Sequence, residues 1–200
     1  MHNEIMASIS AEALNQIFRE ARTYRAWRPE PVPEHLLREL YDLTKLGPTS
    51  GNSSPARFVF VTSEQAKQRL LLALDPGNVE KTRTAPVVVI VAYDTEFYEQ
   101  FPKLMPGVDF RSRFAGKSTL IEETAFRNSS LQGGYMILAA RALGLDCGPM
   151  SGFNAEKVNQ EFFPDGKWKA NFLCNLGYGD ASKMPPRVPR MSFEEACMVL

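Results

Sequence analysis

The chain has 200 residues, 44% of them hydrophobic and 23% charged, which is close to the composition of an average globular domain. Its 23 lysines and arginines balance 23 aspartates and glutamates, so the sequence lacks the basic excess typical of proteins that bind nucleic acid or anionic membranes. There is no basic segment followed by an apolar run at the N-terminus, and the apolar stretch 85–93 is too short to span a bilayer. We expect one soluble, cytoplasmic domain over residues 1–200.

The first half of the chain predicts helices alternating with strands. Ser10 and Ser63 are good N-caps, and Pro33 suits the first position of a helix that carries leucines at helical spacing. The run from Ala85 to Ala92 is continuously apolar, as expected for a strand covered on both faces. We expect helices over residues 11–21, 33–46 and 64–74, strands over 58–61 and 85–92, and a loop over 49–55.

The second half is dominated by one long helical pattern. Residues 93–117 are aromatic-rich and predicted to be irregular, and residues 122–143 then form a helix that ends at Gly144. Gly133 and Gly134 lie inside this helix, where each costs about 1 kcal/mol relative to alanine, so we expect another helix to approach closely there, as it could in a dimer. A helix after Asn154, a strand over 171–177 and a capping box at Ser192 complete one α+β domain.

Several kinds of reactive site are missing from the sequence. Cys147, Cys174 and Cys197 are too few and too far apart for a disulfide framework or a zinc site, and we expect buried thiols. Only two histidines occur, which disfavours a histidine-based triad or a multi-histidine metal site, and no metal is expected. No phosphate-binding loop or dinucleotide fingerprint is present. Reactive chemistry would therefore come from an organic cofactor.

Four segments could together bind a flavin. Arg22-Thr23-Tyr24-Arg25 and Arg187-Val188-Pro189-Arg190 each offer two guanidinium groups for a phosphate, although either could be an ordinary solvated basic segment. The loop over residues 48–52 offers short polar side chains for a polyol, although it could be a plain turn. The glycines of residues 144–153 would let backbone N–H groups approach a flat ring, although they could simply end the long helix.

Taken in order along the chain, these segments resemble the FMN-dependent nitroreductase family. The family opens with an arginine-rich segment and a Pro-Val-Pro helix start, found here as Arg22-Thr23-Tyr24-Arg25 and Pro31-Val32-Pro33. Its asparagine loop matches residues 48–55, and its Asn-x-x-Lys pair ahead of an Ala-Pro strand matches Asn78-Val79-Glu80-Lys81. Its glycine-rich stretch matches residues 144–153, and its terminal phosphate-binding arginine matches Arg187.

Within the family, the chain is most similar to the malonic semialdehyde reductases of pyrimidine nitrogen degradation. The residues that carry this narrower resemblance lie in four segments, residues 125–130, 148–153, 177–183 and 192–197. The chain departs from the family pattern at Ala56, where an aromatic residue is often found, and at Ser151, where an acidic residue is usual. The first departure removes a stacking contact, and the second affects how the chain would orient a nicotinamide or an electron-rich acceptor.

The resemblance implies an intertwined α+β homodimer with a central mixed, mainly antiparallel sheet flanked by helices and one FMN in each of two sites at the subunit interface. Pro48, Thr49, Ser50 and Asn52 would come from the other subunit, and a backbone N–H near Ser151 and Gly152 would lie close to flavin N5. The implied cofactor-binding residues are Arg22, Thr23, Arg25, Pro48, Thr49, Ser50, Asn52, Asn78, Lys81, Pro149, Met150, Ser151, Gly152, Arg187 and Arg190.

The resemblance also implies a ping-pong reaction in which NADPH or NADH delivers hydride to flavin N5 and an acceptor then takes it. The favoured acceptor is malonic semialdehyde, which would become 3-hydroxypropanoate. Its carboxylate needs a cation, and the candidates are Arg111, Arg113, Lys117 and Arg127. The alternatives are a broad nitroaromatic or quinone reductase and a flavin-binding protein without turnover.

Overall fold

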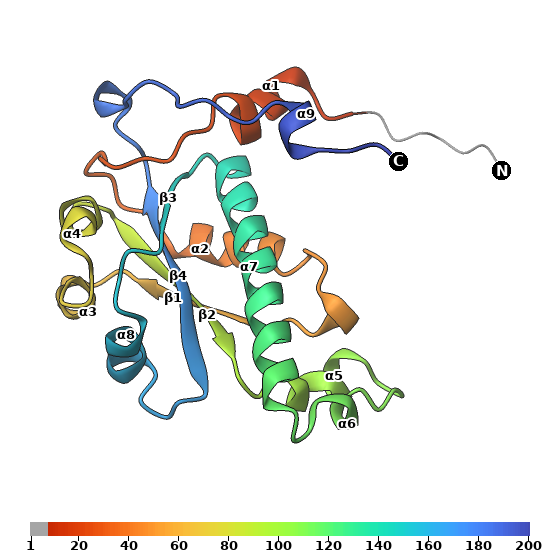
Figure 1. Cartoon of the computed structure of the whole chain (residues 1–200). Helices are drawn as coiled ribbons and strands as arrows, with labels where there is room; N and C mark the ends of the chain where they lie inside the picture. The colour runs from red at the N-terminus through yellow and green to blue at the C-terminus, as the bar shows by residue number, and fades with distance from the viewer. Residues whose placement is uncertain (1–7) are drawn as a thin grey trace.

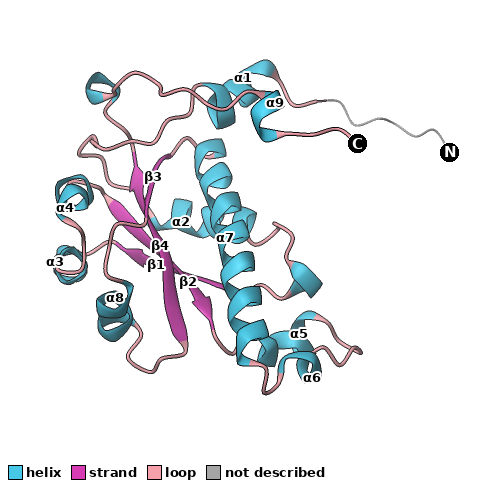
Figure 2. Ribbon diagram, in the orientation of Figure 1, coloured by secondary structure: helices cyan, strands magenta, loops and turns pink. Residues whose placement is uncertain are grey.

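The computed structural model describes residues 8–200, and its centre is a four-stranded sheet in the order β1-β2-β4-β3 (Figures 1 and 2). All three strand pairings are antiparallel, and one isolated parallel bridge, between Thr23 and Cys147, is added at the outer side of β3. The strands are β1 (Ala56–Val61), β2 (Val87–Asp94), β3 (Asp146–Met150) and β4 (Trp168–Gly177). The α+β class is confirmed, with an antiparallel sheet.

Helices cover both faces of the sheet, because the side chains of β2 alternate between two cores. Val87, Val89 and Val91 pack with residues of α2 (Glu34–Thr44) and α7 (Ser118–Ala142). The residues between them pack with α3 (Glu64–Leu71) and α8 (Ala155–Phe162). All eight residues of β2 are buried, which confirms the prediction of a strand covered on both sides. Figure 1 shows α3, α4 (Pro76–Arg83) and α8 on one side of the sheet and α7 on the other.

The long helix α7 contains two central glycines, and another part of the chain packs closely against only one of them. A Cβ atom at Gly133 would lie 2.4 Å from the Phe172 ring of β4, so this glycine allows a strand side chain, rather than a helix, to approach. A Cβ at Gly134 would meet no atom within 4 Å. Gly144 follows the helix with φ of 78°, which confirms the predicted stop.

Residues 93–117 contain more structure than predicted. They form three short helical turns, η3 (Phe97–Gln100), α5 (Phe101–Leu104) and α6 (Arg111–Phe114). The turns surround a third core, in which Phe97, Phe101 and Phe114 lie with ring centroids 5.1–6.2 Å apart. The aromatic residues that made the segment look irregular therefore hold it together.

The two ends of the described chain lie side by side as an arm at the C-terminal end of α7 (Figures 1 and 2). The arm contains α1 (Ala11–Leu14), the π-helical turn η1 (Asn15–Arg19) and α9 (Phe193–Ala196). The Ser10 cap and the Ser192 capping box are confirmed, although the first helical segment ends at residue 19. Residues 185–200 are all exposed.

Helix α4 and strand β3 were also not predicted. Helix α4 (Pro76–Arg83) contains a glycine near its start, and β3 contains Gly148-Pro149, which is unfavourable in a central strand. Proline is tolerated in β3 because the strand lies at an edge of the sheet. Cys147 and Cys174 are buried as predicted, but Cys197 is exposed. Across residues 8–200, no helix is both long and apolar enough to cross a membrane.

Candidate functional site

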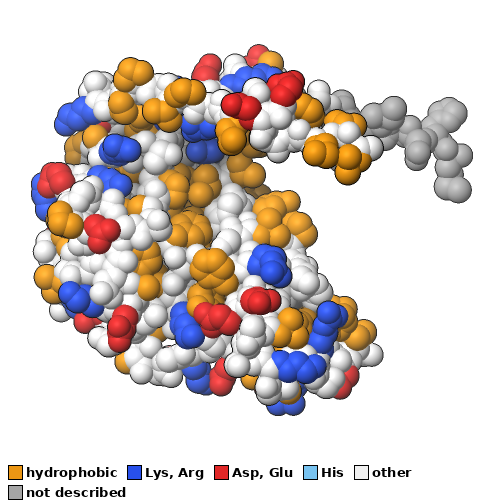
Figure 3. All heavy atoms as spheres, in the orientation of Figure 1, with side chains coloured by type: hydrophobic (Ala, Val, Ile, Leu, Met, Phe, Trp, Pro, Cys, Tyr) orange, Lys and Arg blue, Asp and Glu red, His pale blue; other side chains and the backbone are white. Residues whose placement is uncertain are grey.

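A cavity of 460 Å³ gathers arginines from three distant parts of the sequence. Arginines 22 and 25 come from the segment after η1, Arg141 from the last turn of α7, and arginines 187 and 190 from the C-terminal segment. Thr23 also lines this cavity, which we call the arginine cavity. No carboxylate of the described chain is among its lining residues. Figure 3 shows Lys and Arg side chains in blue near the base of the arm. The cavity is therefore suited to an anion.

The edge of β3 positions the segment that carries Arg22, Thr23 and Arg25. Thr23 forms a bridge with Cys147, and the backbone N–H of Tyr24 donates to the Cys147 carbonyl over 3.0 Å. A Cβ at Gly148 would lie only 2.7 Å from the Tyr24 carbonyl oxygen. The glycine that looked like part of a ring-binding turn thus lets the arginine-bearing segment lie against the sheet.

Arginines near each end of the chain donate hydrogen bonds to backbone carbonyls near the other end. Arg22 Nη2 donates to the Pro185 carbonyl over 2.6 Å, and Arg187 Nη2 donates to the carbonyls of Arg19 and Ala21 over 2.8 and 3.0 Å. Because these acceptors are neutral, the positive charges of the guanidinium groups stay uncompensated. The structure therefore brings together residues 22–25 and 187–190, as the sequence predicted.

Arg141 belongs to the same cavity and was not predicted. Its Nη1 donates to the Ile17 carbonyl over 3.2 Å, while its Nε is buried and has no partner among the described atoms. Gln16 donates to the carbonyls of Arg141 and Ala142, which holds η1 against the end of α7. A basic residue in the last turn of a helix is ordinary, so the sequence gives no signal for this role.

Helix α4 extends the site from the arginine cavity towards the glycine-bearing turn after β3. Asn78 and Lys81 lie one helical turn apart on α4. Asn78 Nδ2 donates to the Gly152 carbonyl over 2.6 Å. Burial, and secondly the positive charge of Arg25, lower the pKa of the Lys81 amine. Lys81 thus lies close enough to Arg25 to feel its charge, and Asn78 contacts Gly152; we call the row Arg25, Lys81, Asn78 and Gly152 the path.

The turn after β3 offers backbone rather than side chains. A Cβ at Gly152 would lie 2.5 Å from Asn78 Nδ2 and 2.8 Å from an oxygen of Asp75, so a larger residue would have to displace one of these side chains. Ser151 is exposed. The Met150 side chain, in contrast, is buried in the core, and its sulfur accepts a hydrogen bond from Thr82 over 3.7 Å. Only the backbone of Met150, next to the half-buried Pro149, could face a ligand.

Within one chain, the predicted loop over residues 48–52 lies far from the arginine cavity. Its Ser50 N–H donates to Asn128 Oδ1 over 2.8 Å, in the first half of α7, whereas Arg141 lies in the last turn of that helix. The 13 residues between Asn128 and Arg141 correspond to about 20 Å of helix. Pro48, Ser50 and Asn52 are exposed, and Asn52 donates to the Leu104 carbonyl over 3.0 Å.

The candidate substrate-binding cations lie near the same end of α7 as the loop. Arg111 forms an ion pair with Glu99 over 2.6 Å, so its charge is already compensated. Arg113, Lys117 and Arg127 are exposed, and none of them has an ion-pair partner within residues 8–200.

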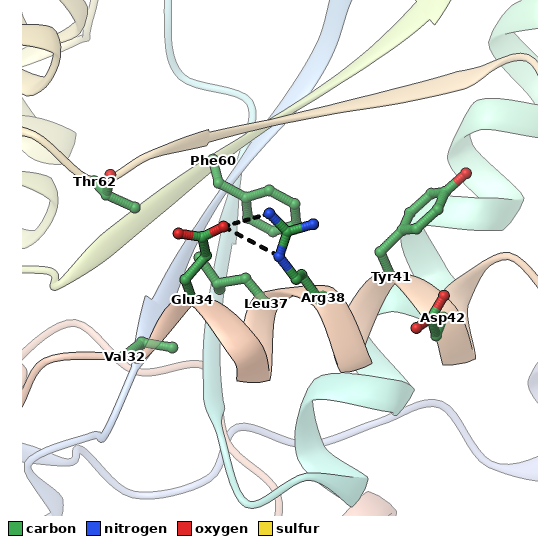
Figure 4. Close-up of a pocket in the computed structure, with 8 residues that line it drawn as sticks. All are labelled: Val32, Glu34, Leu37, Arg38, Tyr41, Asp42, Phe60 and Thr62. Atoms are coloured by element: carbon green, nitrogen blue, oxygen red, sulfur yellow. Dashed lines mark hydrogen bonds and ion pairs between the residues drawn. The ribbon is translucent and has the colours of Figure 1, made fainter.

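A larger cavity, of 740 Å³, lies between α2 and β1 (Figure 4). None of the predicted site residues lines it. Two of its lining residues, Glu34 and Arg38, lie one turn apart on α2 and form an ion pair with each other. Cavity size alone would therefore have pointed away from the residues that the sequence singled out.

Two known proteins with similar sequences carry the same type of name. A Ralstonia nicotianae protein named "Putative NADH dehydrogenase/NAD(P)H nitroreductase RSc1004" is 61% identical over 195 residues, covering 98% of this chain and all of that protein. A protein of the same type from Polynucleobacter asymbioticus is 60% identical over 196 residues, again covering 98% of this chain and all of the relative.

Solved structures show the same fold at much lower identity. A nitroreductase family protein from Streptococcus pneumoniae has a TM-score of 0.81 at 19% identity, covering 92% of this chain and 98% of that one. A protein from Exiguobacterium sibiricum, described as a nitroreductase in complex with FMN, has a TM-score of 0.82 at 19% identity and covers 98% of this chain and all of its own. The nitroreductase family model matches residues 18–178, and the chain belongs to the nitroreductase family.

Proposed function

We propose that the chain is an FMN-dependent, NAD(P)H-using oxidoreductase whose arginine cavity binds the FMN phosphate. The observation that carries the proposal is that Arg22 and Arg187, 165 positions apart in sequence, line one cavity without a carboxylate. A phosphate monoester carries close to two negative charges at neutral pH and accepts several charge-assisted hydrogen bonds. The residues present therefore fit the phosphate end of FMN, and the Arg141 Nε supplies one further buried donor.

The path from the cavity through α4 fits the rest of the cofactor. Lys81 lies next to the phosphate end, Asn78 would meet the edge of the ring, and the backbone of residues 149–152 would lie against it. FMN, when bound, supplies an atom that accepts hydride from a nicotinamide and passes it to an acceptor. The chain itself would hold the phosphate, orient the ring and present backbone N–H groups, and no side chain is proposed to take up or release a proton.

The site is completed by a second copy of the chain in this proposal. A two-fold axis perpendicular to α7 makes the two copies of that helix antiparallel, which brings the loop 48–52 of one copy to the arginine cavity of the other. Phe126, Leu131 and Tyr135 of α7 are large, exposed hydrophobic residues that such a contact would cover. Figure 3 shows hydrophobic side chains in the hollow beneath the arm.

We further propose malonic semialdehyde as the acceptor. The support is the sequence resemblance over residues 125–130 and 148–153, together with exposed cations at the end of α7 that the second copy would bring to the cofactor. Arg113 and Arg127 remain candidates for the substrate carboxylate, while Arg111 is the weaker one because Glu99 already pairs with it. The curated relatives are named for nitro compounds, so a nitroaromatic is the competing acceptor.

Anaerobic reduction followed by reoxidation tests donor, cofactor and acceptor in one experiment. The purified protein, loaded with FMN, is mixed with NADPH or NADH without oxygen, and the visible flavin band should bleach. Malonic semialdehyde should then restore the band faster than a nitroaromatic or a quinone at equal concentration. A band that NADPH and NADH leave unbleached would indicate a flavin-binding protein without turnover. Faster reoxidation by the nitroaromatic would overturn the semialdehyde assignment.

Variants of the exposed arginines test how the acceptor is recognised. Arg113→Ala or Arg127→Ala should raise KM for malonic semialdehyde about 10- to 100-fold, since one charge-assisted hydrogen bond contributes about 1.5–3 kcal/mol. The KM for an uncharged aldehyde should not change. Arg111→Ala is the matched control, because this arginine already pairs with Glu99. Equal effects on both aldehydes would exclude carboxylate recognition by these side chains.

A further inference from the structure

The loop that follows α2 has a backbone conformation that needs support. Gly51, Asn52 and Ser54 all have positive φ, at 56°, 51° and 39°. Glycine and asparagine tolerate this region, but serine seldom adopts it, so the surrounding structure must hold the end of the loop at Ser54 in place. The Ser54 N–H donates to Thr49 Oγ1 over 3.0 Å, which closes the loop on itself but does not attach it to the rest of the chain.

Two buried amides on α7 provide that attachment. Asn128 Oδ1 accepts from the Ser50 N–H over 2.8 Å, and Gln132 Oε1 accepts from the Ala56 N–H over 2.9 Å. Both side chains are only 4% exposed, and they lie one helical turn apart on the same face of α7. One amide holds the loop before its positive-φ residues and the other holds it after them.

The Asn128 side chain is itself fixed in orientation. Its Nδ2 donates to the Thr124 carbonyl over 2.8 Å within α7, so its oxygen must face the loop. The neighbouring Ser129 and Ser130 hydroxyls accept from Asn171 of β4 instead, over 2.8 and 2.9 Å. The sequence segment 125–130 therefore contains one residue that holds the loop and two that hold the sheet.

We propose that Asn128 and Gln132 are positioning residues that fix residues 49–54 in the conformation needed to complete the cofactor site of a second copy. The inference rests on the proposed function, in which Thr49, Ser50 and Asn52 reach the FMN of that copy. Ser50 and Asn52 are exposed in the single chain, Asn52 Nδ2 donates to the Leu104 carbonyl, and the backbone beneath them is anchored to buried amides. The loop can therefore present polar groups outward without rearranging when a ligand binds.

Near-isosteric variants test the two amides. Asn128→Leu and Gln132→Met remove one acceptor each and leave the Ser50 or Ala56 N–H without its partner. We expect FMN to bind about tenfold or more weakly to each variant, as measured by quenching of flavin fluorescence. Ser129→Ala is the matched control, because it removes a buried hydrogen bond from the same helical turn but leaves the loop attached. Melting temperatures of all variants, recorded without FMN, measure the purely structural loss.

A third variant tests the orientation of the amide and remains informative if the apolar variants do not fold. In Asn128→Asp at neutral pH, the introduced carboxylate can accept from Ser50 but cannot donate to the Thr124 carbonyl. Acidification protonates this carboxyl and restores a donor, so FMN affinity relative to wild type should recover as the pH falls. A ratio to wild type that does not change with pH would contradict the proposed role of Asn128.

The outcomes separate this inference from the proposed function. Wild-type protein that binds no FMN would overturn the proposed function, and with it the inference that depends on that function. A different result would overturn the positioning role alone. In that result the wild type binds FMN, and the amide variants bind FMN no more weakly than Ser129→Ala does when their melting temperatures fall by the same amount. Faster amide exchange of residues 50–56 in the FMN-free variants, but not in Ser129→Ala, is the further expected result.

Discussion

The two ends of α7 are built on opposite principles. The C-terminal end carries the arginine cavity, whose guanidinium groups are bound to neutral carbonyls of exposed segments. The N-terminal end carries a core of aromatic rings and a loop attached to buried amides. The C-terminal end therefore gathers guanidinium groups in a cavity lined largely by exposed segments, whereas the N-terminal end gathers packed aromatic rings and buried hydrogen bonds. We infer that the C-terminal end supplies affinity for an anion, and that the N-terminal end fixes the conformation of the loop beside it.

The largest expected effect tests where stability resides. Phe97 is fully buried among Tyr98, Phe101 and Phe114, so Phe97→Ala should lower the free energy of unfolding by about 3–5 kcal/mol. Phe18 at the arginine cavity is 52% exposed, and Phe18→Ala should cost less than about 1 kcal/mol in the monomeric chain. Urea unfolding at low protein concentration measures both. If Phe18→Ala lowered the free energy of unfolding as much as Phe97→Ala does, the contrast between the two ends of α7 would be wrong. Phe18 would then be packed against another part of the protein or a second copy in solution.

The next effect concerns affinity without stability. Arg22→Ala and Arg187→Ala should each weaken FMN binding by about 10- to 100-fold, the equivalent of one charge-assisted hydrogen bond. Affinity should also depend less steeply on salt in each variant. Arg38→Ala removes a guanidinium from the cavity between α2 and β1 and serves as the control. Titration of FMN at several salt concentrations checks the prediction, and an affinity in Arg22→Ala that matches Arg38→Ala would refute it.

The same contrast separates what the sequence could predict from what it could not. The apolar run of β2, the capping serines and the leucines of α2 are local signals, and each predicted its element. Strand β3 was missed because Gly148-Pro149 is a poor strand sequence. That strand exists because β4 pairs with it and the segment 22–25 lies against its other side, contacts that no local pattern encodes.

The arginine cavity was only partly predictable for a related reason. Arg22, Thr23, Arg25, Arg187 and Arg190 stand in short basic segments, and the family resemblance gave these segments a meaning. Arg141 stands alone at a helix end, and only the fold brings its guanidinium to the others. The buried amides of α7 were likewise visible as residues of a family-like segment, but their partners on the loop depend on how α7 packs.

A smaller effect depends on pH. Burial and Arg25 lower the pKa of Lys81 below the ordinary lysine value of 10.5, so Lys81 loses its proton earlier than an exposed lysine. FMN affinity should therefore fall about tenfold as the pH rises through this lowered pKa, because one cation near the phosphate is lost. Arg25→Ala removes the repulsion and should move the fall to higher pH. Lys81→Gln is the control and should lack the transition, whereas a transition that persists in Lys81→Gln would assign it to another group.

The stability of the FMN-free protein should change in the opposite direction. Between the lowered pKa of folded Lys81 and the ordinary value of 10.5, the unfolded chain binds more protons than the folded chain. The contribution of Lys81 to the free energy of unfolding therefore rises with pH over this range. Comparing urea unfolding of wild type with that of Lys81→Gln isolates this contribution from other titrating groups. Such a rise would show that folding disfavours the charged form of Lys81, chiefly through burial and secondly through the positive charge of Arg25.

The smallest effect concerns Gly134, which lies between the two ends of α7. A Cβ there meets no atom within 4 Å of its own chain, so Gly134→Ala should stabilise the isolated chain by about 1 kcal/mol through helix propensity. If two copies of α7 pack antiparallel along this face, the same methyl group falls in the contact and should weaken the dimer. Gly77→Ala in α4 is the matched control, because its Cβ also meets open space and it lies outside the proposed contact. Sedimentation should therefore show weaker association of the two copies for Gly134→Ala and wild-type association for Gly77→Ala. Unchanged association in both variants would mean that the face of α7 around Gly134 is exposed to solvent, and that no second copy of α7 connects the arginine cavity of one copy with the loop 48–52 of the other.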